Sequence, residues 1–153
     1  MAAETVAGTK IYISSAIPAT FDVAGYGALT WILIGEVTDG GGHGRTYAVV
    51  NHQPIATRGT RKYKGSFNEG SKTLAVAIDT DDVGQIACSS ALLSDADFSF
   101  KVAYQGGDID YMQAKVVSFP ATTAGVDSMR TGSIGLEITT TKTGVGIVSF
   151  NSP

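Results

Sequence analysis

FSFKVAYQGGDIDYMQAKVVSF, residues Phe98–Phe119, contains the clearest structural pattern in the chain. Apolar and polar side chains alternate on both sides of Gly106 and Gly107, which is typical of strands with one buried face. Two alternating runs around a glycine pair predict an antiparallel hairpin with a two-residue turn, in which both glycines adopt positive φ. In that register Tyr104 lies opposite Ile109.

Shorter strand-like segments lie on both sides of this hairpin. Nineteen glycines and many threonines disfavour helix interiors, and threonine favours strands. We therefore predict a mainly β protein, a β-sandwich or barrel of about nine strands. Besides the hairpin, strands are expected at Lys10–Ser14, Leu29–Val37, Arg45–Val50, Lys72–Ile78, Val126–Arg130, Gly135–Thr141 and Val145–Phe150.

One short α-helix is predicted to flank the sheet, at residues 80–93. Its apolar residues follow helical spacing, and Asp79 or Thr80 stands where an N-cap is needed. Gly84 weakens the helical propensity of this segment. Cys88, the only cysteine, is expected to be a small buried side chain of this helix.

Length and composition indicate one domain, residues 1–153, with a flexible N-terminal segment at 1–9. Charged residues make up only 16% of the chain, the net charge is −3 and the pI is about 5.2. A base-reading DNA-binding protein is therefore not expected. The N-terminus does not read as a signal peptide and no apolar run approaches a membrane span, so we expect synthesis in the cytoplasm and no membrane insertion.

No constellation of residues predicts an enzyme. His43 lies in a glycine-rich GGGHGR segment, but the Lys-Ser/Thr ending and the helix of a phosphate-binding loop are absent. The aspartates Asp79, Asp81 and Asp82 lack the terminal glutamate of a calcium loop, and helix capping explains them. We predict no catalytic residue, no metal site and no cofactor.

Residues 38–57 form a long connection with weak secondary-structure signals. Its apolar side chains, such as Tyr47 and Ile55, argue against disorder, so we interpret it as an assembly arm that needs a partner surface. An extended basic segment, Arg58–Phe67, follows, and a contact with an acidic neighbouring subunit explains it best. The candidate interface residues are Gly40, His43, Arg45, Tyr47, Val49, His52, Ile55, Arg58, Arg61, Lys62 and Lys64.

Several segments, in this order, resemble the major tail tube proteins of long, non-contractile-tailed (siphovirus-type) bacteriophages. The resemblance covers residues 30–142, and no single segment is specific by itself. The segments are IGEVTD (Ile34–Asp39), YKGSFNEGS (Tyr63–Ser71), DTDDVGQ (Asp79–Gln85), the hairpin Phe98–Phe119, VDSM (Val126–Met129) and LEIT (Leu136–Thr139).

The resemblance implies a structural virion protein that self-assembles into stacked, hexameric rings and forms the tail tube, a conduit for genome delivery. Its implied partners are further copies of itself and the tail terminator, baseplate or tip, and tape-measure proteins. Double-stranded DNA would pass through the lumen without sequence-specific binding. Lysine and arginine bind phosphates, so we expect an acidic or neutral lumen, with the basic residues of the arm at subunit contacts.

Two alternatives stay open at this point. The related tubes of contractile tails and of bacterial secretion systems share the implied fold. A β-sandwich carbohydrate-binding module is the other alternative, and it would need an exposed aromatic platform. Trp31 is the only tryptophan and lies in a strand that is expected to be buried, which argues against such a platform.

Overall fold

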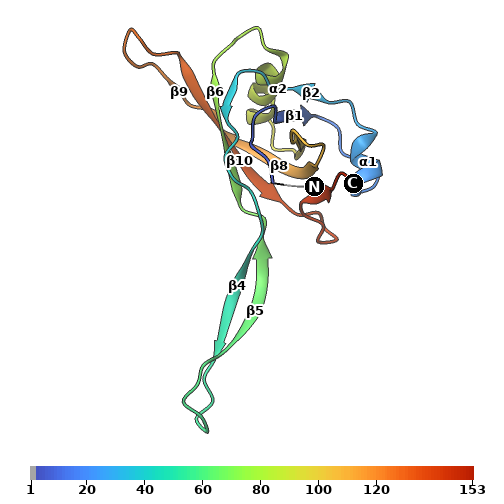
Figure 1. Cartoon of the computed structure of the whole chain (residues 1–153), viewed down its shortest axis with the longest axis vertical. Helices are drawn as coiled ribbons and strands as arrows, with labels where there is room; N and C mark the ends of the chain where they lie inside the picture. Colours follow the sequence, from blue (N-terminus) through green and yellow to red (C-terminus); the bar gives the residue numbers. More distant parts are fainter. Residues whose placement is uncertain (1–2) are drawn as a thin grey trace.

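The computed structural model describes residues 3–153 and has a nine-stranded sheet curled around one core, with a two-stranded hairpin projecting from it (Figure 1). This confirms the prediction of a mainly β, barrel-like fold with a flanking helix. The elements in chain order are β1 (Lys10–Ser14), α1 (Val23–Gly27), β2 (Ile32–Leu33), β3 (Val37–Asp39), β4 (Thr46–His52), β5 (Arg61–Asn68), β6 (Ser71–Ala77), α2 (Val83–Leu92), β7 (Phe98–Ala103), β8 (Ile109–Ser118), β9 (Ala121–Thr122), β10 (Thr131–Thr139) and β11 (Val148–Phe150).

The main sheet is antiparallel, in the order β2-β1-β7-β8-β10-β6-β3, with β11 added to β8 and β9 to β10. The two ends of this order are joined by only three residues, Ile34–Glu36. The Ile34 amide donates to the Ile11 carbonyl on β1, and the Ala77 amide on β6 donates to the Glu36 carbonyl, both at 2.9 Å. The joining segment therefore bonds to both ends of the sheet and curls it toward a barrel.

The predicted continuous strand Leu29–Val37 is wrong. It is divided into β2, which pairs with β1, and β3, which pairs with β6. Glu36 adopts φ +59°, in the left-handed region that a strand does not use, so the chain bends there. Ile34 is buried, which explains the apolar run without a long strand.

The Phe98–Phe119 hairpin is formed by β7 and β8, but the predicted register is wrong by one residue. Ala103, and not Tyr104, is the partner of Ile109. The loop has three residues, closed by the Tyr104 amide donating to the Asp108 carbonyl at 2.9 Å, and only Gly107 adopts positive φ, at +103°. A three-residue loop with one left-handed glycine and a two-residue primed turn both fit the twist of paired strands. The sequence pattern alone therefore does not distinguish the two loop types.

The core lies between the curled sheet and α2. Phe100, Met112, Leu74 and Ile134 are completely or almost completely buried in it. Cys88 of α2 joins this core, as predicted, and burial raises the pKa of its thiol to about 12.

The predicted helix exists but begins later. Asp82, and not Asp79 or Thr80, is the N-cap of α2, and its carboxylate accepts from the Gln85 amide at 2.9 Å. A second helix that the sequence analysis did not predict, the short α1, lies within the segment Ser15–Gly27.

Local side-chain capping explains why α1 forms in a glycine-containing segment. The Asp22 carboxylate accepts from the Gly25 amide at 2.7 Å at its N-terminus, and Tyr26 is fully buried. The strand expected at Val126–Arg130 is absent: Ser128 closes a turn there, and β10 begins at Thr131.

The N-terminal segment 3–9 contains a turn closed by the Thr9 amide and the Val6 carbonyl, 3.0 Å apart. The flexibility expected for residues 1–9 stays a prediction, and residues 1–2 of that segment lie outside the described residues. Within residues 3–153, no helix has both the length and the apolar character required to cross a bilayer.

Candidate subunit interface

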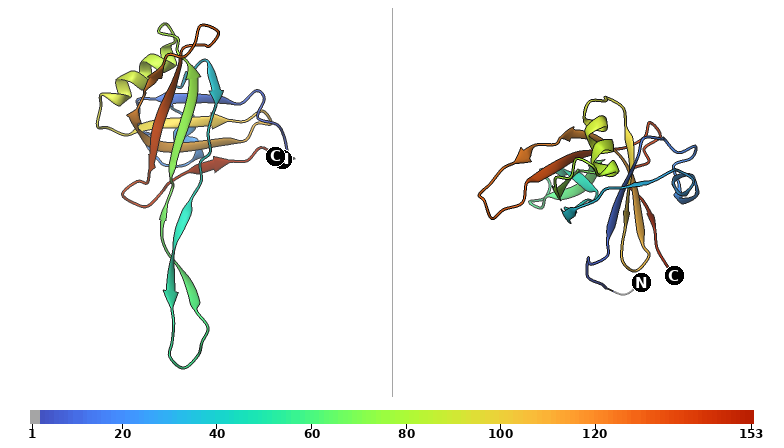
Figure 2. Two further views of the ribbon diagram at one scale, coloured as in Figure 1. Left: turned by 90° about the vertical axis from the view of Figure 1, so that its left-hand side faces the viewer. Right: turned by 90° about the horizontal axis from the view of Figure 1, so that it is seen from above.

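The projecting hairpin β4–β5, residues 46–68, is the arm. It extends from the body along the long axis of the molecule (Figures 1 and 2). Every residue of β4 is exposed, and so is every residue of β5 except Phe67. The predicted boundaries of 38–57 are therefore wrong. The basic segment that follows them is the second strand of the same arm, while residues 38–45 belong to the body and to the base of the arm.

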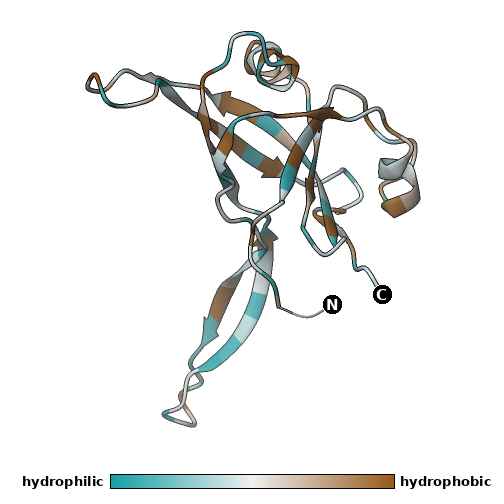
Figure 3. Cartoon of the chain, turned by 45° about the horizontal axis from the view of Figure 1, so that its top comes forward, coloured by the Kyte–Doolittle hydropathy of each residue, from teal (hydrophilic) through white to brown (hydrophobic). Residues whose placement is uncertain are grey.

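The arm exposes apolar as well as polar side chains. Ile55 at its tip is fully exposed, and Val49, Val50 and Tyr63 are each more than half exposed. Figure 3 shows a hydrophobic segment within β4, the strand that holds Val49 and Val50, beside the mostly hydrophilic β5. An isolated two-stranded hairpin is marginal in water, and apolar residues gathered on one projection are typical of an interaction surface.

The arm has a charge opposite to that of the body. Residues 45–68 contain five basic residues and no acidic residue. The rest of the chain contains six basic and fourteen acidic residues, a net charge of −8. A basic arm on an acidic body is electrostatically complementary to another copy of the same chain.

The structure brings most of the predicted interface residues together on the arm and leaves two outside it. Gly40 and His43 lie before β4, in the segment that connects β3 to the arm. The cross-strand partners on the arm include His52 with Arg61 and Asn51 with Lys62. The predicted residues on or immediately beside the arm are Arg45, Tyr47, Val49, His52, Ile55, Arg58, Arg61, Lys62 and Lys64.

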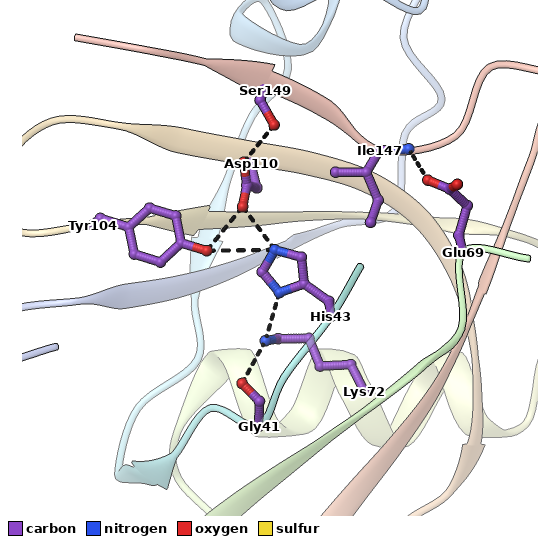
Figure 4. Close-up of polar contacts among 8 residues, drawn as sticks. All are labelled: Gly41, His43, Glu69, Lys72, Tyr104, Asp110, Ile147 and Ser149. Atoms are coloured by element: carbon purple, nitrogen blue, oxygen red, sulfur yellow. Dashed lines mark hydrogen bonds and ion pairs between the residues drawn. The ribbon is translucent and has the colours of Figure 1, made fainter. Parts of the chain in front are cut away.

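A buried carboxylate ties the base of the arm to the body. Glu69 is only 2% exposed and accepts from Arg45 Nε at 2.5 Å and from the Ile147 amide at 2.7 Å (Figure 4 shows the Ile147 contact). The Arg45 guanidinium also lies over the Phe67 ring, 3.9 Å from its centroid, and Tyr47 packs beside that ring at 5.7 Å. The hydrogen bond to Glu69 and, after it, the one to the Tyr47 hydroxyl raise the pKa of Arg45.

A second polar cluster anchors the segment that leads into the arm (Figure 4). His43 Nε2 lies 2.7 Å from Asp110 Oδ2, and the Tyr104 hydroxyl donates to the same oxygen at 2.8 Å. Lys72 Nζ lies 3.1 Å from His43 Nδ1 and donates to the Gly41 carbonyl at 3.3 Å. A protonated lysine has only donors, so Nδ1 accepts and Nε2 carries the hydrogen that Asp110 accepts.

In this cluster, burial shifts the pKa of Asp110 and of Lys72 in one direction, and neighbouring polar or charged groups shift it in the other. For Asp110, burial raises the pKa, but hydrogen bonds from His43, Ser149 and Tyr104 outweigh it and lower the pKa to about 2. For Lys72, burial lowers the pKa although Asp110 and Asp39 oppose the shift. The side chains satisfy one another and hold the start of the arm against β6, β7 and β8.

Sequence reasoning missed Glu69, Lys72, Tyr104 and Asp110 as parts of this region. They lie in or beside different strands and meet the arm only in the folded chain, so no sequence spacing predicts them. The carbohydrate-platform alternative is not favoured, because Trp31 is half-buried, donates to the Tyr26 carbonyl at 3.1 Å and is covered by Lys101. Among residues 3–153, no group of three or more His, Cys, Asp or Glu side chains is placed to hold a metal ion.

Comparison with known proteins was informative only at the level of structure. No protein-family model and no curated protein matches the sequence. A chain of the SPP1 tail tube is 17% identical, with a TM-score of 0.65 over 97% of this chain and 80% of that one. The sheath/tube terminator of PVC, an extracellular contractile injection system, is 8% identical, with a TM-score of 0.69 over 99% of both chains.

A chain in the virion of a native gene transfer agent particle gives a similar result. It is 10% identical, with a TM-score of 0.67 over 97% of this chain and 100% of that one. The three structural similarities extend over nearly the whole chain, so they include the curled sheet, the helices and the arm. The fold of this chain is therefore the one found in the SPP1 tail tube and in the PVC tube terminator.

Proposed function

We propose that this chain is the tube subunit of a siphovirus-type phage tail, a structural virion protein that assembles into stacked rings and encloses a conduit for the genome. The fold likeness to the SPP1 tail tube over 97% of the chain supports this assignment. In this proposal the protein resides in the virion tail. Its partners are other copies of itself and the terminator, baseplate or tip, and tape-measure proteins of the tail.

The observation that carries the proposal is the arm. A hairpin that exposes Val49, Ile55 and Tyr63 and carries four basic residues has no covering surface within residues 3–153. A copy of the chain provides the opposite charge. Contacts between two different surfaces of identical copies close into rings or continue as filaments, and a tube of stacked rings uses both outcomes.

The charge distribution also suits the passage of DNA. The body carries a net charge of −8, whereas the basic residues Arg58, Arg61, Lys62 and Lys64 lie together on the arm. If subunit contacts neutralise the arm, a lumen formed by the body repels phosphates and lets DNA slide. A reconstructed tube whose lumen is lined by those four basic side chains would contradict this part of the proposal.

The tube of a contractile system is the second candidate, because the fold likeness to the PVC sheath/tube terminator is equally extensive. The two candidates differ in whether a sheath surrounds the tube. Both require that copies of this chain assemble, so one assembly experiment tests both against a monomeric binding module.

The experiment compares the wild-type chain with a variant that has a shortened arm. Replacing residues 48–66 by Asn-Gly keeps the Tyr47–Phe67 pair and the Arg45–Glu69 contact, and a two-residue loop fits directly opposed residues. This design is preferable to removing Gly40–Pro54, which would also delete His43 and Arg45 and leave β5 unpaired. The thermal unfolding temperature shows whether the shortened chain keeps its core.

Sedimentation velocity and negative-stain electron microscopy, at the highest attainable concentration, measure assembly. We expect hollow tubes or stacked rings from the wild-type chain and folded monomers from the shortened one. A wild-type chain that forms only a small, defined oligomer, unchanged by shortening the arm, would contradict the proposal and favour a binding module.

A further inference from the structure

The surface around α2 lies at the end of the molecule opposite to the arm. Figures 1 and 2 show α2 at one end of the long axis and the tip of the arm at the other. The helix exposes apolar side chains there: Val83 and Ile86 are at least half exposed, and Leu93, just after the helix, is 89% exposed. Apolar residues gathered on one helix face are typical of a docking surface.

A groove runs beside this helix face. It has a volume of about 290 Å³ and lies between α2 and the segments that hold Ile78 and Phe119. Ile86 on the helix and Leu93 just after it form its apolar wall, and Ser89 and Ser90 add hydroxyl groups. The groove is therefore mainly apolar, with polar groups along one side.

The charge around the groove is opposite to that of the arm. Residues 73–100 contain five aspartates and no basic residue. Asp79 lines the groove, and Asp81 and Asp95 are exposed just before and after the helix. The arm has four basic residues and no acidic one, so the two ends of the molecule carry charges of opposite sign.

We propose that the α2 groove of one copy receives the arm of a second copy. The inference rests on the proposed tube function, and it names the receiving surface. Because donor and receiver lie at opposite ends of the long axis, an arm does not reach the groove of its own chain. Each copy offers one arm and one groove, so the contact is heterologous and repeats from copy to copy along the tube.

In this contact the apolar side chains Ile55 and Tyr63 cover the apolar wall of the groove. Arg61 lies on the same side of β5 as Tyr63 and faces the aspartates around α2, while Lys62, on the opposite side of the strand, adds to the positive charge of the arm. Charge complementarity of this kind sets the orientation and suppresses wrong pairings, because like charges brought together cost several kcal/mol. The apolar contact supplies the part of the affinity that salt does not screen.

Charge exchange between the two surfaces tests the proposal. The helix variant carries Asp81→Lys with Asp95→Lys, and the arm variant carries Arg61→Glu with Lys62→Glu. Each pair changes the local charge by four while leaving the described hydrogen bonds of the body intact. The third protein combines both pairs, and a control with Asp81→Glu and Asp95→Glu keeps the charge at the same helix positions.

The measurement is the critical concentration for assembly, by sedimentation at low and at high ionic strength, with thermal unfolding of each monomer as a test of folding. We expect each variant to raise the critical concentration about tenfold or more at low salt, equivalent to ~1.4 kcal/mol. The combined protein should recover most of this loss, and the control should assemble like the wild-type chain. High salt should reduce the effect, because it screens exposed charges.

The outcomes separate the two proposals. If the wild-type chain assembles and the shortened arm abolishes assembly, but the folded helix variant assembles at the wild-type concentration, the groove is not the receiver and only this inference is overturned. Loss of assembly in both charge variants without recovery in the combined protein also overturns the pairing. If the wild-type chain does not assemble at all, the proposed function fails and the inference fails with it.

Discussion

Arg45 Nε lies 2.5 Å from Oε1 of Glu69, a carboxylate that is almost completely removed from solvent where the arm joins the sheet. Arg45 precedes β4 and Glu69 follows β5, so the pair clamps the two strands at their base. The Ile147 amide binds the other carboxylate oxygen and connects this clamp to the C-terminal segment. This ion pair and its hydrogen bonds, together with the His43 cluster, fix the base of the arm to the body.

Replacing Arg45 by Met should destabilise the fold by ~2 kcal/mol, because it leaves the buried Glu69 carboxylate without its cation. The value lies below that for a fully buried pair, since the Arg45 side chain is 37% exposed and water can partly replace it. Urea unfolding measures the free energy. Lys62→Met, on the exposed part of the arm, is the control and should stay within ~0.5 kcal/mol of the wild-type chain; equal effects of both substitutions would contradict the clamp.

Asp110 should make the fold sensitive to acid. Its pKa is about 2 in the folded chain and 3.8 in the reference state, so its ionised form stabilises the folded state. The sign follows from linkage: the contribution, about 2 kcal/mol, is complete above about pH 4 and is lost as the pH falls toward 2. Chemical unfolding of wild type and Asp110→Asn at several pH values measures it. The two stability curves should converge below pH 3, and a constant difference down to pH 2 would contradict this role.

Asp82 should be the aspartate before α2 that matters most for stability. Its carboxylate accepts from the Gln85 amide at 2.9 Å as the N-cap and from the Gly35 amide at 3.0 Å, which ties the helix to the bend between β2 and β3. Asp82→Ala removes the acceptor of both hydrogen bonds and should lower the free energy of unfolding by ~2 kcal/mol. Asp81→Ala, one residue earlier and exposed, should cost less than ~0.5 kcal/mol in the same unfolding experiment. Similar losses would show that neither bond is important.

Gly84 should resist replacement although it lies in a helix. A Cβ at this position would lie 2.1 Å from the Leu33 carbonyl oxygen and 2.5 Å from the Ile34 Cα, both in the backbone. Alanine gains about 1 kcal/mol of helix propensity over glycine, but the clash forces α2 away from β2. We therefore expect Gly84→Ala to lower stability by ~2 kcal/mol or more. Ser89→Ala, at an exposed position of the same helix, should be neutral or slightly stabilising in thermal unfolding.

Features that depend on neighbouring residues could be predicted from the amino-acid sequence. Alternation of period two predicted the β7–β8 hairpin and the other main strands, because each side of a strand meets one environment. Helical spacing after a cluster of aspartates predicted α2, although Asp82 was the cap. The exposed apolar and basic residues of the arm were recognised as an interface candidate from composition alone, and that interface stays a prediction.

Features that depend on residues far apart in the chain could be seen only in the folded structure. The bend at Glu36 exists because Ile34 and Glu36 bond to opposite ends of the curled sheet. Arg45 and Glu69 meet because β4 pairs with β5, and His43 lies near Lys72 because β3 pairs with β6, so no local sequence pattern predicts either contact. The placement of the arm and α2 at opposite ends of one axis is likewise a property of the folded chain, because it depends on the order in which the strands pair and not on any single segment.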